Sequence, residues 1–158
     1  AGEQYVALAI KTGNFNLNWI KLEKVAANLG TFRLQNVWRT NQFINIENGA
    51  VEASTIPAGS LSSHWVFEPI SGSAVVRLVN RWKPEQVLTI ANANLTTANA
   101  SKADTNSHWE LESASNGEYR LKNRAQPTQY IHVEYGRLQV GAIQPGWWSA
   151  RWKLEEVN

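Results

Sequence analysis

The chain carries its clearest structural signal in residues 119–155, which read YRLKNRAQPTQYIHVEYGRLQVGAIQPGWWSARWKLE. Two weaker copies precede this motif, and they place Arg33, Arg77 and Arg120 at spacings of 44 and 43 residues. Four further columns hold one residue type in all three copies: Asn36, Asn80 and Asn123; Gln42, Gln86 and Gln129; Trp65, Trp109 and Trp152; Glu68, Glu112 and Glu155. Self-similarity at a period of roughly 20–50 residues is the signature of a repeat architecture. The sequence therefore predicts three structural units of one design.

Each copy divides into four short segments with the alternation of a β-strand, and none shows a helical period. In the third copy these segments cover residues 118–123, 129–134, 137–143 and 150–155. A unit of this size cannot bury its apolar face alone, so three units are expected to close around a threefold axis as a short barrel capped by hairpins. We therefore predict an all-β fold of three pseudo-symmetric, four-stranded repeats over residues 31–70, 74–113 and 117–157.

Composition argues against several functions. Charged residues make up 18% of the chain and the net charge is +2, which is too little to bind nucleic acid through its phosphates. No apolar run reaches the length of about 18 residues that a membrane span requires. Cysteine is absent, so disulfides and thiol chemistry are excluded. His64 and His108 each precede a tryptophan of the repeat and should point outward and apart, so we predict neither a metal site nor a cofactor.

Signatures of catalysis are also missing. The chain shows no Ser-His-Asp spacing, phosphate loop or nucleotide fingerprint. The glutamates that end the repeats should lie far apart, whereas a glycosidase needs two carboxylates within about 10 Å of each other. We therefore expect a protein that is not an enzyme. The alternative, a fragment of a glycoside hydrolase that itself cleaves, requires the isolated chain to release reducing ends.

The motifs follow a fixed order: YRLxNR, then Q-aromatic-I-x-V, then a glycine turn, and then S-x-W-x-L-E. This order resembles the ricin-B type β-trefoil lectin repeat, and the resemblance covers residues 31–155. The third element of that family is usually Gln-x-Trp. Here Ser63, Ser107 and Ala150 replace the glutamine while the tryptophans remain, which indicates a divergent branch. The chain is also similar to trefoil modules attached to bacterial polysaccharide-degrading enzymes, which share the style QYxHxExGxLxxGxIxPGWWSAxW. The resemblance implies a β-trefoil fold, carbohydrate binding, and a secreted, extracellular parent protein of several modules.

Residues 1–25 lie outside the repeats and predict a β-hairpin with a turn at residues 12–14. The segment TGNFNLNWIKLEKV resembles the last strand of family-six carbohydrate-binding modules, which are β-sandwiches. That resemblance implies that the hairpin ends a preceding module, that residues 26–30 are a linker, and that the domain is a monomer or is covalently joined to other modules. The alternative is an extra N-terminal hairpin that packs against the repeats.

The candidate binding residues combine rings with polar groups, because a sugar site needs rings for the C–H face and polar side chains for the hydroxyls. Ricin-type lectins use an Asp in the second strand of a repeat, but the matching residues here are Asn45, Thr89 and His132. The galactose site of that family is therefore not carried over, although Asn and His can still bond hydroxyls. We predict a ligand site in the third copy, then the first, then the second, from His132, Glu134, Tyr135, Trp147, Trp148, Arg124, Trp38, Asn45, Glu47 and Trp82.

Several of these residues have a purely structural alternative. One of Trp147 and Trp148 should pack over the barrel end, with at least one of them exposed. Trp38 and Trp82 align with Ala125, which favours a surface position, because a core site would hardly accept both tryptophan and alanine. The arginine and asparagine columns should satisfy backbone groups of the loops. The alternative function is a protein-interaction trefoil whose exposed tryptophans anchor a partner.

Overall fold

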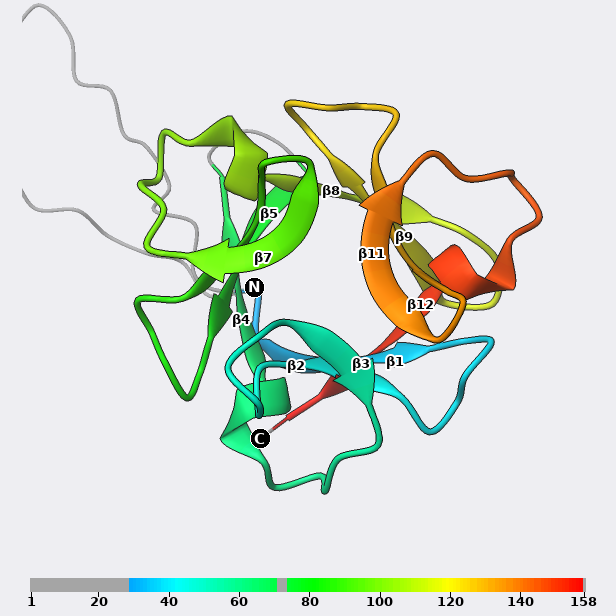
Figure 1. Cartoon of the computed structure of the whole chain (residues 1–158), viewed down its shortest axis with the longest axis horizontal. Coiled ribbons are helices and arrows are strands. Elements are labelled where there is room, and N and C mark those ends of the chain that lie inside the picture. Colours follow the sequence, from blue (N-terminus) through cyan, green and yellow to red (C-terminus); the bar gives the residue numbers. More distant parts are fainter. Residues whose placement is uncertain (1–28, 71–73, 158) are drawn as a thin grey trace, which may run out of the picture.

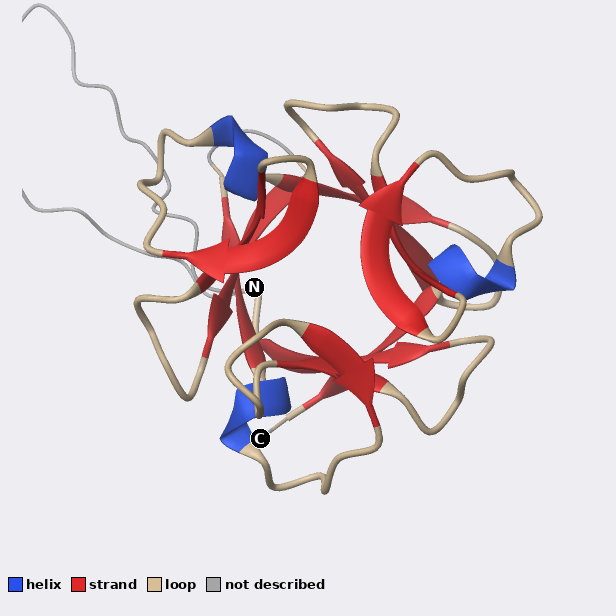
Figure 2. Ribbon diagram, viewed as in Figure 1, coloured by secondary structure: helices blue, strands red, loops and turns tan. Residues whose placement is uncertain are grey.

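The computed structural model describes residues 29–70 and 74–157, and the predicted hairpin of residues 1–25 lies outside these residues. The described part contains twelve β-strands and three short 3-10 turns (Figure 2). They are β1 (Thr31–Asn36), β2 (Phe43–Asn45), β3 (Glu52–Ser54), η1 (Leu61–Ser63), β4 (Trp65–Pro69), β5 (Val75–Asn80), β6 (Val87–Ala91), β7 (Asn94–Ala98), η2 (Thr105–Ser107), β8 (Trp109–Ser113), β9 (Glu118–Asn123), β10 (Tyr130–Glu134), β11 (Arg137–Gly141), η3 (Trp148–Ala150) and β12 (Trp152–Glu156). In this part of the chain no helix could cross a membrane.

Six of the strands form a closed barrel. The ring runs β1–β4–β5–β8–β9–β12 and returns to β1, with every neighbouring pair antiparallel. The other six strands form three hairpins, β2–β3, β6–β7 and β10–β11, which cap one end. Figure 1 shows these hairpins around a common centre, one per repeat. The predicted β-trefoil fold, with three four-stranded repeats, is confirmed.

Among the six barrel strands, pairing is more extensive between repeats than within a repeat. β12 of the third repeat pairs with β1 of the first from Phe32–Glu156 to Asn36–Trp152. Within the first repeat, β1 and β4 pair only at Thr31–Val66 and Phe32–Trp65. The loop that follows β1 therefore lies beside the turn that precedes β12, although these two segments belong to different repeats.

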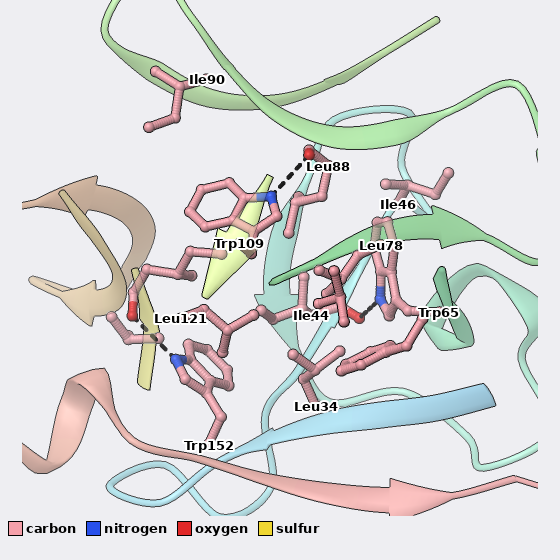
Figure 3. Packing of buried hydrophobic residues seen from close by; sticks show 14 residues of the cluster. Leu34, Ile44, Ile46, Trp65, Leu78, Leu88, Ile90, Trp109, Leu121 and Trp152 are labelled. Carbon is pink, nitrogen blue, oxygen red and sulfur yellow. Dashed lines mark hydrogen bonds between the residues drawn. The ribbon is translucent and has the colours of Figure 1, made fainter. Parts of the chain in front are cut away.

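The core contains one equivalent leucine and one equivalent tryptophan from every repeat. Leu34, Leu78 and Leu121 alternate inward from β1, β5 and β9 and are fully buried. Each core tryptophan also needs a partner for its indole N–H when it is removed from water. Trp65, Trp109 and Trp152 donate from Nε1 to the carbonyl oxygens of Ile44, Leu88 and Ile131 at 2.9, 2.9 and 3.0 Å (Figure 3). These bonds fasten each capping hairpin to the barrel.

The arginine column binds loop backbone groups, as predicted. Arg33, Arg77 and Arg120 donate to the carbonyl oxygens of Ile56, Ala100 and Pro145, which lie in the loops that follow β3, β7 and β11. Arg33 and Arg77 also pair with Glu155 and Glu68 at 3.4 and 2.8 Å. Burial lowers the pKa of Arg33, and the charge of Glu155 partly opposes this shift. The arginines therefore tie the irregular loops to the barrel wall.

Candidate functional site

The strand register brings the candidate residues together at the junctions between repeats. After β1, the Val37 amide donates to the carbonyl oxygen of Arg151 at 2.9 Å, just before β12. The Arg81 amide makes the equivalent bond to His64, and that of Arg124 to His108. Three loops, which carry Trp38, Trp82 and Ala125 respectively, are therefore held against the 3-10 turn of the preceding repeat.

The asparagine column completes each junction. Asn36 accepts hydrogen bonds at Oδ1 from the amides of Trp38 (3.1 Å) and Arg39 (2.9 Å), and its Nδ2 donates to the carbonyl oxygen of Ser149 at 2.8 Å. Asn80 makes the same set with Trp82, Lys83 and Ser62, and Asn123 makes it with Ala125, Gln126 and Asn106. The prediction that the asparagines satisfy loop backbone groups is confirmed, and each one joins two repeats.

The junction of the third and first repeats contains the larger of two related cavities, which we call cavity A. Its volume is about 360 Å³ and its lining is Trp38, Val133, Glu134, Gly146, Trp147, Trp148 and Ser149. Trp148 is 60% exposed and Trp38 48% exposed, so neither contributes mainly to packing. As expected, at least one of the paired tryptophans faces solvent.

A hydrogen-bonded chain beneath cavity A holds its carboxylate. Glu134 Oε2 accepts from Gln139 Nε2 at 2.9 Å, and the same amide nitrogen lies 3.1 Å from Nε2 of the buried His132. His132 Nδ1 lies 3.0 Å from the carbonyl oxygen of Tyr130. A carbonyl can only accept, so Nδ1 carries a proton, while Nε2 faces the Gln139 amide and lies 3.5 Å from Glu134 Oε2. The second oxygen of Glu134, Oε1, has no hydrogen bond among the described residues and is free for a ligand.

His132 supports cavity A from below. Its ring makes an edge contact with Trp147, with ring centroids 5.8 Å apart. Gly141 on β11 leaves room for the imidazole, because an added Cβ would come within 3.1 Å of His132 Cε1. His132 is 2% exposed and does not line the cavity, so its effect on a ligand would pass through Trp147 and Glu134.

The junction of the first and second repeats holds the counterpart, cavity B, of about 290 Å³. It is lined by Glu47, Ser60, Leu61, Ser62 and Trp82, which are the threefold equivalents of Glu134, Trp147, Trp148, Ser149 and Trp38. Glu47 Oε2 accepts from Ser62 Oγ at 2.5 Å, so this carboxylate is also held on one oxygen. Cavity B thus keeps one carboxylate and one tryptophan but lacks the Trp147–Trp148 pair.

The third junction, that of the second and third repeats, has neither the glutamate nor the loop tryptophan. The equivalents of the glutamate and of the loop tryptophan are Ala91 and Ala125, and Asp104 and Thr105 stand where cavity A has its tryptophan pair. Cavities A and B share a further feature, a cation over the loop tryptophan. Arg39 lies 4.4 Å from the Trp38 ring centroid, and Lys83 lies 4.4 Å from that of Trp82. Such a contact restrains an exposed indole.

Besides His132 and Tyr135, two more predicted site residues, Arg124 and Asn45, do not line cavity A or B. Arg124 is exposed at the third junction, away from the carboxylates and tryptophans of cavities A and B. Asn45 is fully buried and fully bonded, to Phe43, Ser54 and Glu47, so it supports the β2–β3 hairpin. Tyr135 and Glu134 adjoin one another at the end of β10, beside cavity A.

The expectation that His64 and His108 point outward is wrong. Both are buried, and their Nε2 atoms lie 2.7 and 3.0 Å from the carbonyl oxygens of Ala58 and Lys102. The loops that follow β3 and β7 cover these two histidines, and the imidazoles bind carbonyl groups of those loops that need a partner. Within the described residues, no group of three or more His, Asp or Glu side chains could hold a metal ion.

The predicted site of the first repeat contains both Trp38 and Glu47, whereas the structure pairs Trp38 with Glu134 and Trp82 with Glu47. A signal for this pairing was present. When each loop residue is matched with the preceding repeat, tryptophan and glutamate occur together twice and alanine accompanies alanine once. Matching within repeats breaks that pattern.

Solved structures of low sequence identity share the fold. The GlcNAcα1-4Gal-releasing endo-β-galactosidase from Clostridium perfringens matches with a TM-score of 0.73 and 23% identity, over 82% of this chain and 33% of that one. The designed threefold-symmetric protein ThreeFoil matches with a TM-score of 0.70 and 21% identity, over 81% of this chain and 99% of that one. A Polyporus squamosus lectin bound to a Neu5Acα2-6Galβ1-4GlcNAc epitope matches with a TM-score of 0.69 and 15% identity, over 80% of this chain and 49% of that one.

This chain therefore spans about a third of the endo-β-galactosidase and about half of the Polyporus lectin. No curated protein sequence matches it significantly. The family model described as ricin-type beta-trefoil lectin domain-like matches residues 62–144, which is just over half of the chain. On the strength of that match, and of the closed barrel with its three hairpins, the chain belongs to the ricin-type β-trefoil lectin-like family.

Proposed function

We propose that this domain binds carbohydrate, without catalysis, in cavities A and B. In each cavity a sugar ring would lie against the loop tryptophan, and its hydroxyls would donate hydrogen bonds to the glutamate. The observation that carries the proposal is the joint presence of tryptophan and glutamate at two junctions and their joint replacement by alanine at the third. Two groups that are kept or lost together, and that face one cavity, are best explained by one shared ligand.

The chemistry of the two groups specifies the ligand class. An exposed indole offers an apolar face, and a carboxylate held on one oxygen offers a fixed acceptor on the other. A ligand that suits both must present C–H groups and hydroxyl groups on neighbouring surfaces, as a sugar does. Family membership and the sugar-bound Polyporus lectin favour the same ligand class.

The arrangement of carboxylates supports a binding role rather than hydrolysis. Among the described residues that line the cavities, each cavity has one carboxylate, Glu134 in A and Glu47 in B. Glycoside hydrolysis by the usual mechanisms requires a pair of carboxylates that flank one bond. We further infer that the domain is an accessory module of a longer extracellular protein that acts on polysaccharide. The similarity to one third of an endo-β-galactosidase supports this inference.

Affinity electrophoresis in gels that contain agarose, xylan or laminarin, followed by calorimetric titration with the matching sugar, tests the proposal. We expect two sites per chain, with cavity A tighter because three of its lining residues are tryptophans. Trp147→Ala or Glu134→Gln should remove the tighter site, and Trp82→Ala the weaker one. Arg124→Ala, which alters the third junction alone, is the matched control and should change neither site.

Three outcomes would contradict the proposal. A third site of similar affinity would show that the tryptophan and glutamate do not define the ligand site. Release of reducing ends by the isolated chain would contradict the absence of catalysis. If no carbohydrate retards the protein, while Trp147→Ala and Trp148→Ala abolish capture of a protein partner, the protein-interaction alternative replaces carbohydrate binding.

A further inference from the structure

The turn between β10 and β11 carries a residue that the local backbone disfavours. Tyr135 has a φ of 49° and Gly136 a φ of 76°, while the equivalent residues of the second repeat, Asn92 and Ala93, have values of 50° and 60°. Two-residue hairpin turns with positive φ at both positions favour Asn, Asp and Gly, because a bulky side chain clashes with its own backbone there. Tyr135 therefore strains a turn in which the second repeat uses asparagine.

Folding of the domain does not account for this tyrosine. Its side chain is 91% exposed, and within the described residues its ring forms no aromatic pair and its hydroxyl no hydrogen bond. A residue that contributes neither packing nor hydrogen bonds, and that strains the backbone, persists for another reason. Such outliers cluster at ligand sites.

A second departure from local preference borders the same cavity. Trp147 occupies the position before η3, and its side chain makes no cap hydrogen bond. The equivalent Asp104 accepts a hydrogen bond from the Asn106 amide at 3.0 Å and so caps η2. The third repeat thus replaces an asparagine and an aspartate, both suited to their backbone positions, with aromatic residues. Positions where sequence and local structure disagree are expected at functional sites.

Both aromatic residues are near Glu134, because Trp147 lines cavity A together with this glutamate and Tyr135 follows it in the chain. Tyr135 directly follows Glu134 in the chain, and β10 contacts η3, which carries Trp148. Figure 1 shows the β10–β11 hairpin, in orange, beside the turn that precedes β12. Tyr135 does not line cavity A itself, so it stands just outside, next to the glutamate.

We propose that Tyr135 forms an outer subsite for the neighbouring unit of a sugar chain whose first unit occupies cavity A. The site would therefore take an oligosaccharide or the end of a polysaccharide, and a single sugar would fill only part of it. This inference rests on the proposed carbohydrate binding at cavity A. Cavity B has Asn48 at the equivalent position, so its affinity should not depend on chain length.

Titration of a Trp82→Ala variant, in which only cavity A remains, tests the outer subsite. The ligands are mono- to hexasaccharides of the xylan, laminarin or agarose series, chosen by the polymer that retards the protein. We expect affinity to rise about tenfold from one sugar unit to two or three, which corresponds to a contact worth about 1.4 kcal/mol. Tyr135→Asn in the same background should abolish this rise and leave the affinity for the monosaccharide unchanged. Tyr135→Phe retains the ring and should retain the rise.

Two controls separate a lost contact from a lost fold. Tyr135→Asn should raise the urea midpoint, because Asn-Gly suits the turn, so weaker oligosaccharide binding would not reflect unfolding. A Trp147→Ala variant, which keeps only cavity B, should show no dependence on chain length. Two outcomes would overturn the outer subsite alone. In one, Tyr135→Asn binds the trisaccharide as tightly as its Trp82→Ala parent does. In the other, the affinity of that parent does not rise with the length of the sugar chain. Failure of every sugar to bind would overturn the proposed function itself.

Discussion

Asn36 is fully buried and forms three hydrogen bonds, two with the loop that carries Trp38 and one with the turn that carries Trp148. One side chain thus sets the distance between two walls of cavity A. Asn123 makes equivalent bonds at the third junction, where no tryptophan or glutamate is present. The chain therefore contains its own control for separating the structural role of this asparagine from its role in positioning the site.

At this scale we predict the effects of Asn36→Ala and Asn123→Ala. Each substitution leaves buried backbone groups without a partner and should lower the free energy of unfolding by about 2 kcal/mol, measured by urea titration. Only Asn36→Ala should weaken sugar binding at cavity A, measured by calorimetry on the folded variants. If Asn123→Ala weakens binding to the same extent, the asparagines act through global stability and not through the cavity walls.

At the scale of the elements, the paired strands β8 and β9 carry a cluster of charged side chains. Lys122 on β9 lies directly opposite Glu110 in the register and pairs with Glu110 and Glu112 at 3.2 and 2.6 Å. Hydrogen bonds to Glu112 and Glu110 raise the pKa of Lys122. Burial, and then the charge of Glu112, raise the pKa of Tyr130, whose hydroxyl donates to Glu112 at 3.3 Å.

These two pKa shifts predict how stability depends on pH. Both groups bind protons more tightly in the folded state, so their contribution to stability is complete below the ordinary pKa values of lysine and tyrosine, about 10, and is lost as pH rises above them. The free energy of unfolding should therefore be lower at about pH 11 than at about pH 9, with the decrease beginning near pH 10. Glu112→Gln should reduce this difference in the free energy of unfolding, measured by urea titration at the two pH values. If the difference is the same in the variant, Glu112 is not responsible for the raised pKa values of Lys122 and Tyr130.

At the scale of the whole molecule, threefold symmetry governs the core and is relaxed at the surface. The three core tryptophans are fully buried and bond equivalent carbonyl oxygens of the capping hairpins. The surface positions near the junctions differ from repeat to repeat, as Trp38, Trp82 and Ala125 show. The barrel therefore tolerates loss of a binding site in one repeat without loss of its closure.

Tryptophan substitutions should distinguish the symmetric core from the variable surface. Trp65→Phe, Trp109→Phe and Trp152→Phe should each lower the free energy of unfolding by about 3 kcal/mol, because each leaves a cavity and a buried carbonyl without its donor. Trp38→Phe and Trp82→Phe alter exposed rings and should change it by less than about 0.5 kcal/mol. Thermal and urea unfolding measure both sets. A core variant with a markedly smaller loss than its two equivalents would contradict the equivalence of the three hairpins.

The sequence by itself determined the number of repeats, the strand alternation and the structural role of the arginine and asparagine columns. Strand alternation follows from the period within each copy, and the repeats and their residue columns follow from comparison of the three copies. The sequence also identified Glu134, Trp147, Trp148, Trp38, Glu47 and Trp82 as candidates, because a sugar site combines aromatic rings with polar side chains.

Only the tertiary structure decided which of these candidates share a cavity. Barrel closure pairs the last strand of one repeat with the first strand of the next, so a site assembles from two repeats and not from one. The folded loops also bury His64 and His108, and Asn45 and His132 are enclosed beneath the surface. Strand pairing between segments distant in the chain depends on how the three units meet, and no single repeat contains that information.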